Sequence, residues 1–165
     1  MFVVSPAPNS WRQVAGAVAR RLPELDVALL VVPCRQPEAM AAFVQSAVRT
    51  VFVCTSEEDR QHCEQLFPNA TCVGKPQKTP PLAPASPFPL ELMKVSAEML
   101  TPGLRDCLRV ARLARLHELA PEGKPICCVG GEGDRLDTAI VVVPGLRSDH
   151  ADAHILETLC APYEK

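Results

Sequence analysis

The sequence has few aromatic residues and no excess of positive charge. Aromatic residues make up 4% of its 165 residues, and 17 Lys and Arg against 19 Asp and Glu give a formal net charge of −2. Nucleic-acid-binding domains usually carry a basic face, and single strands bind by stacking on aromatic side chains. We therefore expect no nucleic-acid partner.

Long hydrophobic runs are also missing. No apolar stretch approaches the roughly 20 residues that a membrane-spanning helix needs, and the N-terminal MFVVSPAPNSW lacks the basic and long apolar regions of a secretory signal. The hydrophobic content of 47% still suffices for a sizeable core. These features predict a cytoplasmic protein with no membrane partner, folded as a single domain over residues 1–165.

Cysteines are numerous, but none of them forms a CxxC pair. Most lie within or at the ends of apolar runs, a pattern that favours reduced, buried thiols of a cytosolic protein over a disulfide framework or a zinc site. We therefore expect no metal and no cofactor. The eight residues are Cys34, Cys54, Cys63, Cys72, Cys107, Cys127, Cys128 and Cys160.

Short apolar runs alternate with helical patterns along most of the chain. Such alternation predicts a mostly parallel sheet with helices on both faces. The expected strands are 2–4, 27–32, 50–54, 126–129 and 138–143, with a short edge candidate at 71–73 and a last candidate at 155–160. The expected helices are 10–22, 37–47, 57–67, 90–100 and 102–119.

Residues 76–89 contain six prolines in 14 residues, which excludes a helix interior or a central strand. We interpret this segment as a surface connector. The alternative is a recognition segment for a partner that binds polyproline helices.

The strands 126–129 and 138–143 are separated by only eight residues. A parallel crossover needs a longer connection, so this pair must form an antiparallel hairpin near the C-terminus. The residues thus predict a mostly parallel sheet with helices on both faces and one antiparallel strand.

Two charged patterns each allow a structural and a functional interpretation. Arg105, Arg109, Arg112 and Arg115 recur on one side of a predicted helix. We interpret them as a solvated face paired with acids, and a face toward an anion or a second subunit is the alternative. His150 and His154 alternate with aspartates and invite a metal interpretation, but a polar turn or helix end is favoured.

The hairpin loop, Gly130–Thr138, is rich in glycine. Glycines let backbone N–H groups approach a ligand closely, so an anion could bind against this loop. The alternative is a tight turn in which Asp137 caps the strand or pairs with Arg135.

The block Gly130-Gly131-x-Gly133-x-x-x-Asp137-Thr138-Ala139, followed by a valine-rich strand, resembles a signature of stand-alone proteins related to the pyruvate kinase C-terminal (alpha/beta) domain. Pro102-Gly103-Leu104-Arg105, Asp152-x-x-Ile155-x-Glu157 and the N-terminal residues 2–9 resemble other parts of that domain, so the likeness covers nearly the whole chain. It implies a three-layer α/β/α sandwich, built on a mixed, mostly parallel sheet of about five strands with a C-terminal antiparallel hairpin. The catalytic barrel of pyruvate kinase has no counterpart here, so we expect no kinase activity.

In many members of that family the domain binds a phosphorylated sugar between a helix-start loop and the glycine-rich hairpin loop. Here the first loop is Cys34-Arg35-Gln36-Pro37-Glu38, where Pro37 and Glu38 depart from the family's Ser, Thr and Gly. Arg35 could compensate through a bidentate contact with a phosphate. The resemblance therefore implies these ligand-binding residues: Arg35, Gln36, Gly130, Gly131, Gly133, Arg135, Asp137 and Thr138.

Three functions are compatible with these features. The first is a non-catalytic domain that binds or senses a phosphorylated small molecule or another anion. The second is a homo-oligomeric assembly protein without such a ligand. The third is an enzyme of unassigned chemistry, but no residue set has the spacing of a nucleophile with its base, so we name no catalytic residue.

Overall fold

The computed structural model describes residues 2–4, 10–74, 100–146 and 152–162. Within these ranges the chain forms seven strands and four α-helices, with one 3-10 turn. In order they are β1 (Phe2–Val4), α1 (Ser10–Arg21), η1 (Leu22–Glu24), β2 (Leu30–Pro33), α2 (Pro37–Val44), β3 (Thr50–Val53), α3 (Glu57–Leu66), β4 (Thr71–Val73), α5 (Pro102–Leu116), β5 (Ile126–Gly130), β6 (Thr138–Val143) and β7 (His154–Pro162).

The strands form one mixed sheet in the order β1-β7-β6-β5-β2-β3-β4. The pairs β1/β7, β5/β2, β2/β3 and β3/β4 are parallel, whereas β5/β6 and β6/β7 are antiparallel. The mixed, mostly parallel sheet and the β5–β6 hairpin are therefore confirmed. The expected number of about five strands is too low, because the candidates at 71–73 and 155–160 also join the ladder, as β4 and β7.

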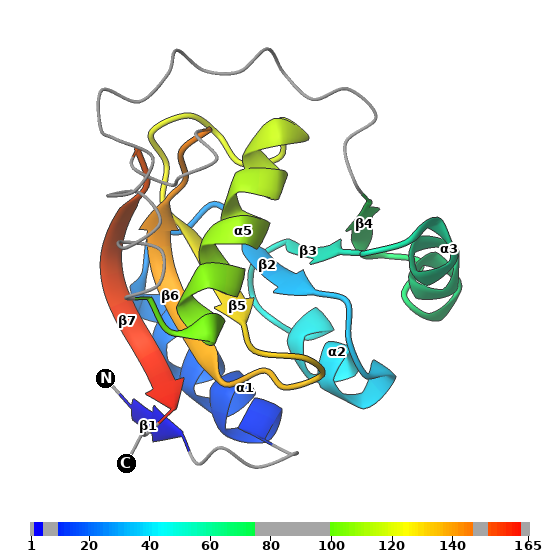
Figure 1. Cartoon of the computed structure of the whole chain (residues 1–165), viewed down its shortest axis with the longest axis horizontal. Helices are drawn as coiled ribbons and strands as arrows, with labels where there is room; N and C mark the ends of the chain where they lie inside the picture. The colour runs from blue at the N-terminus through cyan, green and yellow to red at the C-terminus, as the bar shows by residue number, and fades with distance from the viewer. Residues whose placement is uncertain (1, 5–9, 75–99, 147–151, 163–165) are drawn as a thin grey trace.

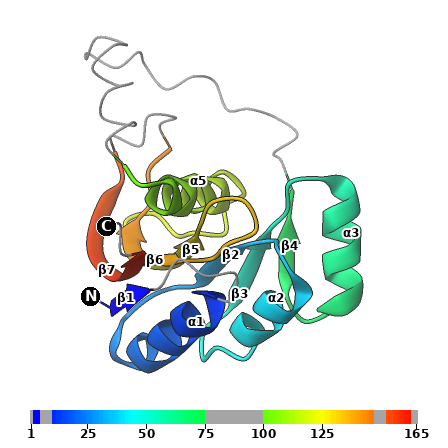
Figure 2. The same cartoon turned by 60° about the horizontal axis from the view of Figure 1, so that its bottom comes forward.

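Helices cover both faces of this sheet, as Figures 1 and 2 show. On one face, α1, α2 and α3 pack over a core that includes Val14, Phe43 and Phe52. On the other face, α5 packs over a second core that includes Val110 and Ile140. Alternate residues along the strands point to opposite faces, which is why one sheet can supply both cores. The three-layer α/β/α architecture is confirmed.

Three element boundaries differ from the prediction by three residues each. Strand β2 begins at Leu30 rather than at residue 27, although Ala28 N donates to Pro125 O and Leu29 O accepts from Cys127 N, at 2.9 and 3.0 Å. Helix α2 ends at Val44, where the Ser46 hydroxyl donates to Val48 O and closes a turn. Helix α5 ends at Leu116, since the chain then enters a left-handed conformation at residue 118 (φ 57°).

Several predictions concern residues outside the described ranges. The proline-rich connector at 76–89, most of the helix expected at 90–100, and His150 lie there. The single-domain organisation also stays a prediction. Among the described helices, none is long and apolar enough to cross a membrane.

Helix α5 approaches the hairpin unusually closely at Gly130. A Cβ at this position would lie 2.6 Å from both Cys107 N and Gly103 O. Gly130→Ala should therefore lower the free energy of unfolding by roughly 3 kcal/mol, because rigid backbone atoms would have to move apart. Urea unfolding followed by circular dichroism measures this change.

Gly16→Ala in α1 is the matched control. A Cβ there would meet only the flexible end of Arg20, at 3.8 Å. Alanine is the better helix former, so this variant should gain about 0.5–1 kcal/mol. Equal effects of the two substitutions would contradict the close-packing argument.

Candidate functional site

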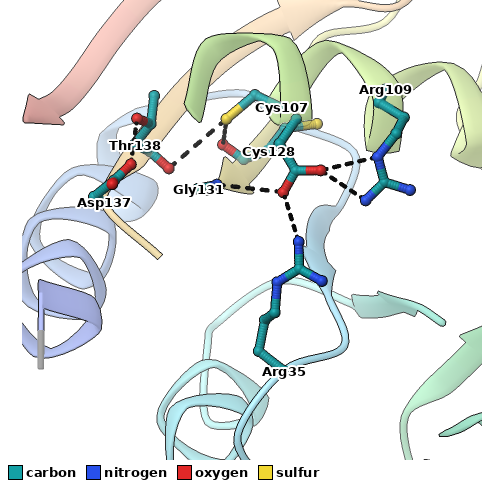
Figure 3. A network of polar contacts seen from close by, with 8 residues as sticks. Arg35, Cys107, Arg109, Cys128, Gly131, Asp137 and Thr138 are labelled. Carbon is teal, nitrogen blue, oxygen red and sulfur yellow. Dashed lines mark hydrogen bonds and ion pairs between the residues drawn. The ribbon is translucent and has the colours of Figure 1, made fainter. Parts of the chain in front are cut away.

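A buried carboxylate, Asp106 of α5, is the centre of a polar network on the α5 face of the sheet (Figure 3). Its Oδ1 accepts from Nε and Nη2 of Arg109, at 2.9 and 2.6 Å. Its Oδ2 accepts from Nη2 of Arg35 and from the backbone N–H of Gly131, both at 3.3 Å. The network therefore joins α5 to the loop after β2 and to the loop after β5.

The fold explains why these residues meet. Strands β2 and β5 are parallel neighbours, so the loops that follow them, with Arg35 and Gly131, leave the same edge of the sheet. Helix α5 begins above that edge, capped by Thr101, whose Oγ1 accepts from Leu104 N at 3.3 Å. The first turn of α5 packs against Thr138 because Gly103 has no side chain. A Cβ at Gly103 would lie 2.0 Å from Oγ1 of Thr138. Asp106 then lies one turn further along the helix.

The charges of this network do not balance. Two guanidinium groups share one carboxylate, which leaves a net charge of +1 among the three side chains. The side chain of Arg35 is only 15% exposed, against 41% for that of Arg109. Within the described part of the chain, Nε of Arg35 is buried and has no hydrogen-bond partner. A buried N–H without a partner is costly, so an acceptor from a ligand would be stabilising there.

The hairpin loop is partly filled by the chain itself. Leu136 is 1% exposed and packs into the core, and its carbonyl accepts from the Ser10 hydroxyl at 2.9 Å. Arg135 donates through Nη2 to Glu132 at 2.6 Å, and Gly133 has the left-handed φ of 59° that this turn requires. Arg135 thus pairs with Glu132 rather than with Asp137.

Asp137 and Thr138 lie at the base of the loop. Both are buried, and the Thr138 hydroxyl donates to Asp137 Oδ1 at 2.9 Å. Burial raises the pKa of the Asp137 carboxyl, while the hydrogen bond from Thr138 and the charge of Arg135 act in the opposite direction. Burial therefore makes this carboxyl less favourable to ionise than an aspartate in water.

The structure brings together only some of the residues expected at a ligand site. Arg35 and Gly131 meet at Asp106, and Gly130 supports them by allowing α5 to approach. Gln36 and Gly133 are exposed and Arg135 is partly exposed, and among the described residues none of these three hydrogen-bonds to the network. Ligand binding by the eight residues stays a prediction.

Sequence reasoning missed Asp106 altogether and assigned Arg109 to a solvated face. A signal was present, since an acid three residues before an arginine on a helix favours an ion pair. The buried position of Asp106 could not be inferred, because it follows from the contact with Gly131. Two of the other three arginines of this stripe are also engaged within the chain: Arg112 donates to Leu146 O at 2.8 Å, and Arg115 pairs with Glu122 at 3.1 Å.

A second cluster lies on the other face of the sheet. The sulfur atoms of Cys34, Cys54 and Cys63 all lie within 4.8 Å of one another. Cys72 adds a fourth sulfur, 2.9 Å from that of Cys63. All eight cysteines are free thiols, and six of them are buried. This cluster was not predicted from the sequence, although VVPC and VFVC each place a cysteine directly after a predicted strand.

Comparison with known proteins identifies a structural neighbour but no related sequence. No protein-family model matches the sequence, and no curated protein matches it. A solved structure of a pyruvate kinase from Cryptosporidium parvum is similar at 9% identity with a TM-score of 0.47, over 81% of this chain. The chain spans only 23% of the length of that pyruvate kinase. The resemblance is thus to a part of such an enzyme and is distant.

Asp106→Asn tests the central carboxylate. Asparagine removes the charge that compensates the buried Arg35 guanidinium, so the free energy of unfolding should fall by about 3 kcal/mol. Glu122→Gln is the control, because Glu122 is 89% exposed in its pair with Arg115 and its loss should leave stability unchanged. Both values come from urea unfolding, and an unchanged stability of Asp106→Asn would contradict the role given to this carboxylate.

Asp137→Asn tests the buried carboxyl of the loop. The folded-state pKa of Asp137 is raised, so its protonated carboxyl contributes to the stability of the wild-type protein. This contribution is fully present below the ordinary Asp pKa of about 3.9, and it is lost as the pH rises through the folded-state pKa. Asparagine does not titrate. The stability of Asp137→Asn relative to wild type should therefore increase from acid to neutral pH. Urea unfolding at a series of pH values checks this, and a flat or falling difference would refute it.

Proposed function

We propose that this chain is a non-catalytic protein that binds a small anion, with a phosphorylated metabolite as the best candidate, and that it derives from the pyruvate kinase C-terminal domain. One observation carries the proposal. Arg35 holds a buried guanidinium whose Nε has no partner among the described residues, in a network with one more cation than anions.

The ligand would approach Arg35 from the side that Asp106 leaves open. Asp106 uses Nη2 of Arg35, so Nε and the remaining N–H groups are the donors available to an oxyanion. Gly131 already donates to Asp106 and would act by positioning that carboxylate rather than by touching the ligand. Gln36, exposed beside Arg35, is the neighbouring side chain that could add a hydrogen bond.

The charge balance also limits the kind of anion. Asp106 repels any negative group that comes close, and only one net positive charge remains to attract it. A single phosphoryl or carboxylate group therefore fits this site better than a polyphosphate does. The position agrees with the general tendency of open α/β sheets to bind ligands beyond the carboxyl ends of their parallel strands.

Homo-oligomeric assembly is the second candidate, and the edge of β7 favours it. Strand β1 pairs only with residues 160–162 of β7, so the preceding part of that edge has no strand neighbour among the described residues. Ile155 and Leu156 there are 41% and 59% exposed. An open edge with apolar side chains is a template for pairing with a second copy.

Thermal unfolding in the presence of anions tests the first proposal. Inorganic phosphate and a series of sugar monophosphates serve as probes. A compound that binds should raise the Tm saturably, by about 5–10 °C at a concentration about 100-fold above its Kd. Arg35→Gln should abolish the rise, since it removes the guanidinium.

Arg12→Gln is the matched control, because Arg12 is an exposed arginine of α1 that lies over the Trp11 ring. Its response should equal that of wild type, and sodium chloride at equal ionic strength should give none. An equal response of Arg35→Gln and wild type would refute the site. No response to any anion, together with a concentration-dependent dimer in light scattering, would favour the assembly function instead.

A further inference from the structure

Three neighbouring parallel strands each carry a cysteine to the same place. Cys34 directly follows β2, Cys54 directly follows β3, and Cys72 lies in β4. In the ladder Pro33 is level with Val53, and Phe52 is level with Cys72. Because side chains alternate along a strand, Cys54 and Cys72 lie on the same face as Phe52, and Cys34 lies beside Cys54 on that face.

A fourth cysteine reaches this cluster from α3, which covers the same part of the sheet. Cys63 is 1% exposed, and its sulfur lies within 4.8 Å of those of Cys34 and Cys54 and 2.9 Å from that of Cys72. Four thiols from four different elements thus converge. Chance packing of apolar residues does not require a sulfur atom at each of these positions.

We propose that Cys34, Cys54, Cys63 and Cys72 bind a zinc ion through their thiolates. A tetrahedral zinc with Zn–S bonds of about 2.3 Å places its sulfur ligands about 3.8 Å apart. The sulfur atoms of Cys34, Cys54 and Cys63 lie within 4.8 Å of one another, close to that spacing, and Cys72 meets the cluster through the sulfur of Cys63 at 2.9 Å. Four protein ligands leave no open position on the metal, so the site is structural rather than catalytic. It replaces the expectation, drawn from the sequence, that the chain binds no metal.

The composition of α3 supports a structural role. Its sequence is EEDRQHCEQL, and Cys63 is its only buried residue. Its one leucine, Leu66, is 44% exposed. A helix without an apolar face gains little from packing, although the Ser56 and Asp59 capping box holds its first turn. A bond from Cys63 to a shared metal would supply the attachment that hydrophobic contacts do not. In Figure 1, α3 lies at the far end of the sheet, beside β4.

Zinc is bound by thiolates, so metal binding at this cluster would release the protons of its thiols.

A disulfide between Cys63 and Cys72 is the main rival explanation. Their sulfur atoms are closer than two unbonded thiols normally approach, so a covalent bond and a shared metal both account for the contact. The two explanations differ in their use of the other cysteines. A disulfide gives no reason for Cys34 and Cys54 to lie in the same cluster, whereas a four-ligand metal site does.

Metal content of the full chain provides the test. The protein is purified under reducing conditions without chelator, and its metals are measured by inductively coupled plasma mass spectrometry. We expect about one zinc per chain. Replacement of zinc by Co²⁺ should produce the intense visible bands of tetrahedral cobalt thiolate, which report the ligands without any mutation.

Variants then locate the ion. Cys54→Ala and Cys63→Ala should each lower the zinc content at least tenfold, whereas Cys127→Ala and Cys160→Ala, at buried cysteines outside the cluster, should retain it. Less than about 0.1 zinc per wild-type chain after supplementation, no cobalt thiolate bands, or a Cys63–Cys72 disulfide in the intact mass would overturn the proposal. Zinc retained by both cluster variants, or another metal at one equivalent, would overturn it equally.

Discussion

The close contact between α5 and the β5–β6 hairpin is the constraint on which the polar site depends. Gly103 and Gly130 face each other there, and a Cβ at either one would overlap neighbouring atoms. Because both residues lack a side chain, α5 packs close enough to the hairpin for Asp106 to accept a hydrogen bond from the N–H of Gly131. The buried carboxylate then holds Arg35, which comes from the loop after β2 at the same edge of the sheet. A wider spacing between helix and hairpin would separate all three groups.

One short loop serves both faces of the sheet. Cys34 and Arg35 are consecutive, yet Cys34 lies in the cysteine cluster while Arg35 reaches Asp106 of α5. Consecutive residues at the end of a strand point to opposite faces, which accounts for this division. The proposed zinc site and the proposed anion site are therefore neighbours in the chain but lie on opposite layers. A metal that orders this loop would also limit the motion of Arg35.

Periodicity predicted the architecture well and the polar contacts poorly. The buried runs at β2, β3, β5 and β6 read directly as strands, and the short hairpin loop dictated the one reversal of direction among them. The ends of the helices were predicted less accurately: α2 stops at Val44, and α5 stops shortly before a single left-handed residue, Glu118. The glycines of the hairpin loop predicted a tight turn and a close approach of the backbone to another group. They did not predict that Asp106 would accept a hydrogen bond from the N–H of Gly131.

The order of apolar runs and turns is a local property, so the sequence alone was enough to establish the layered sheet, its parallel strands and its terminal hairpin. The Asp106 network and the cysteine cluster could not be predicted in this way, because each joins residues that are far apart in the chain. Arg35 and Asp106 meet only after β2 and β5 pair, and four cysteines with no recognisable spacing meet only after three strands align beneath α3. Sequence distance carries no record of such contacts. The tertiary structure decides them through strand order and through the face to which each side chain points.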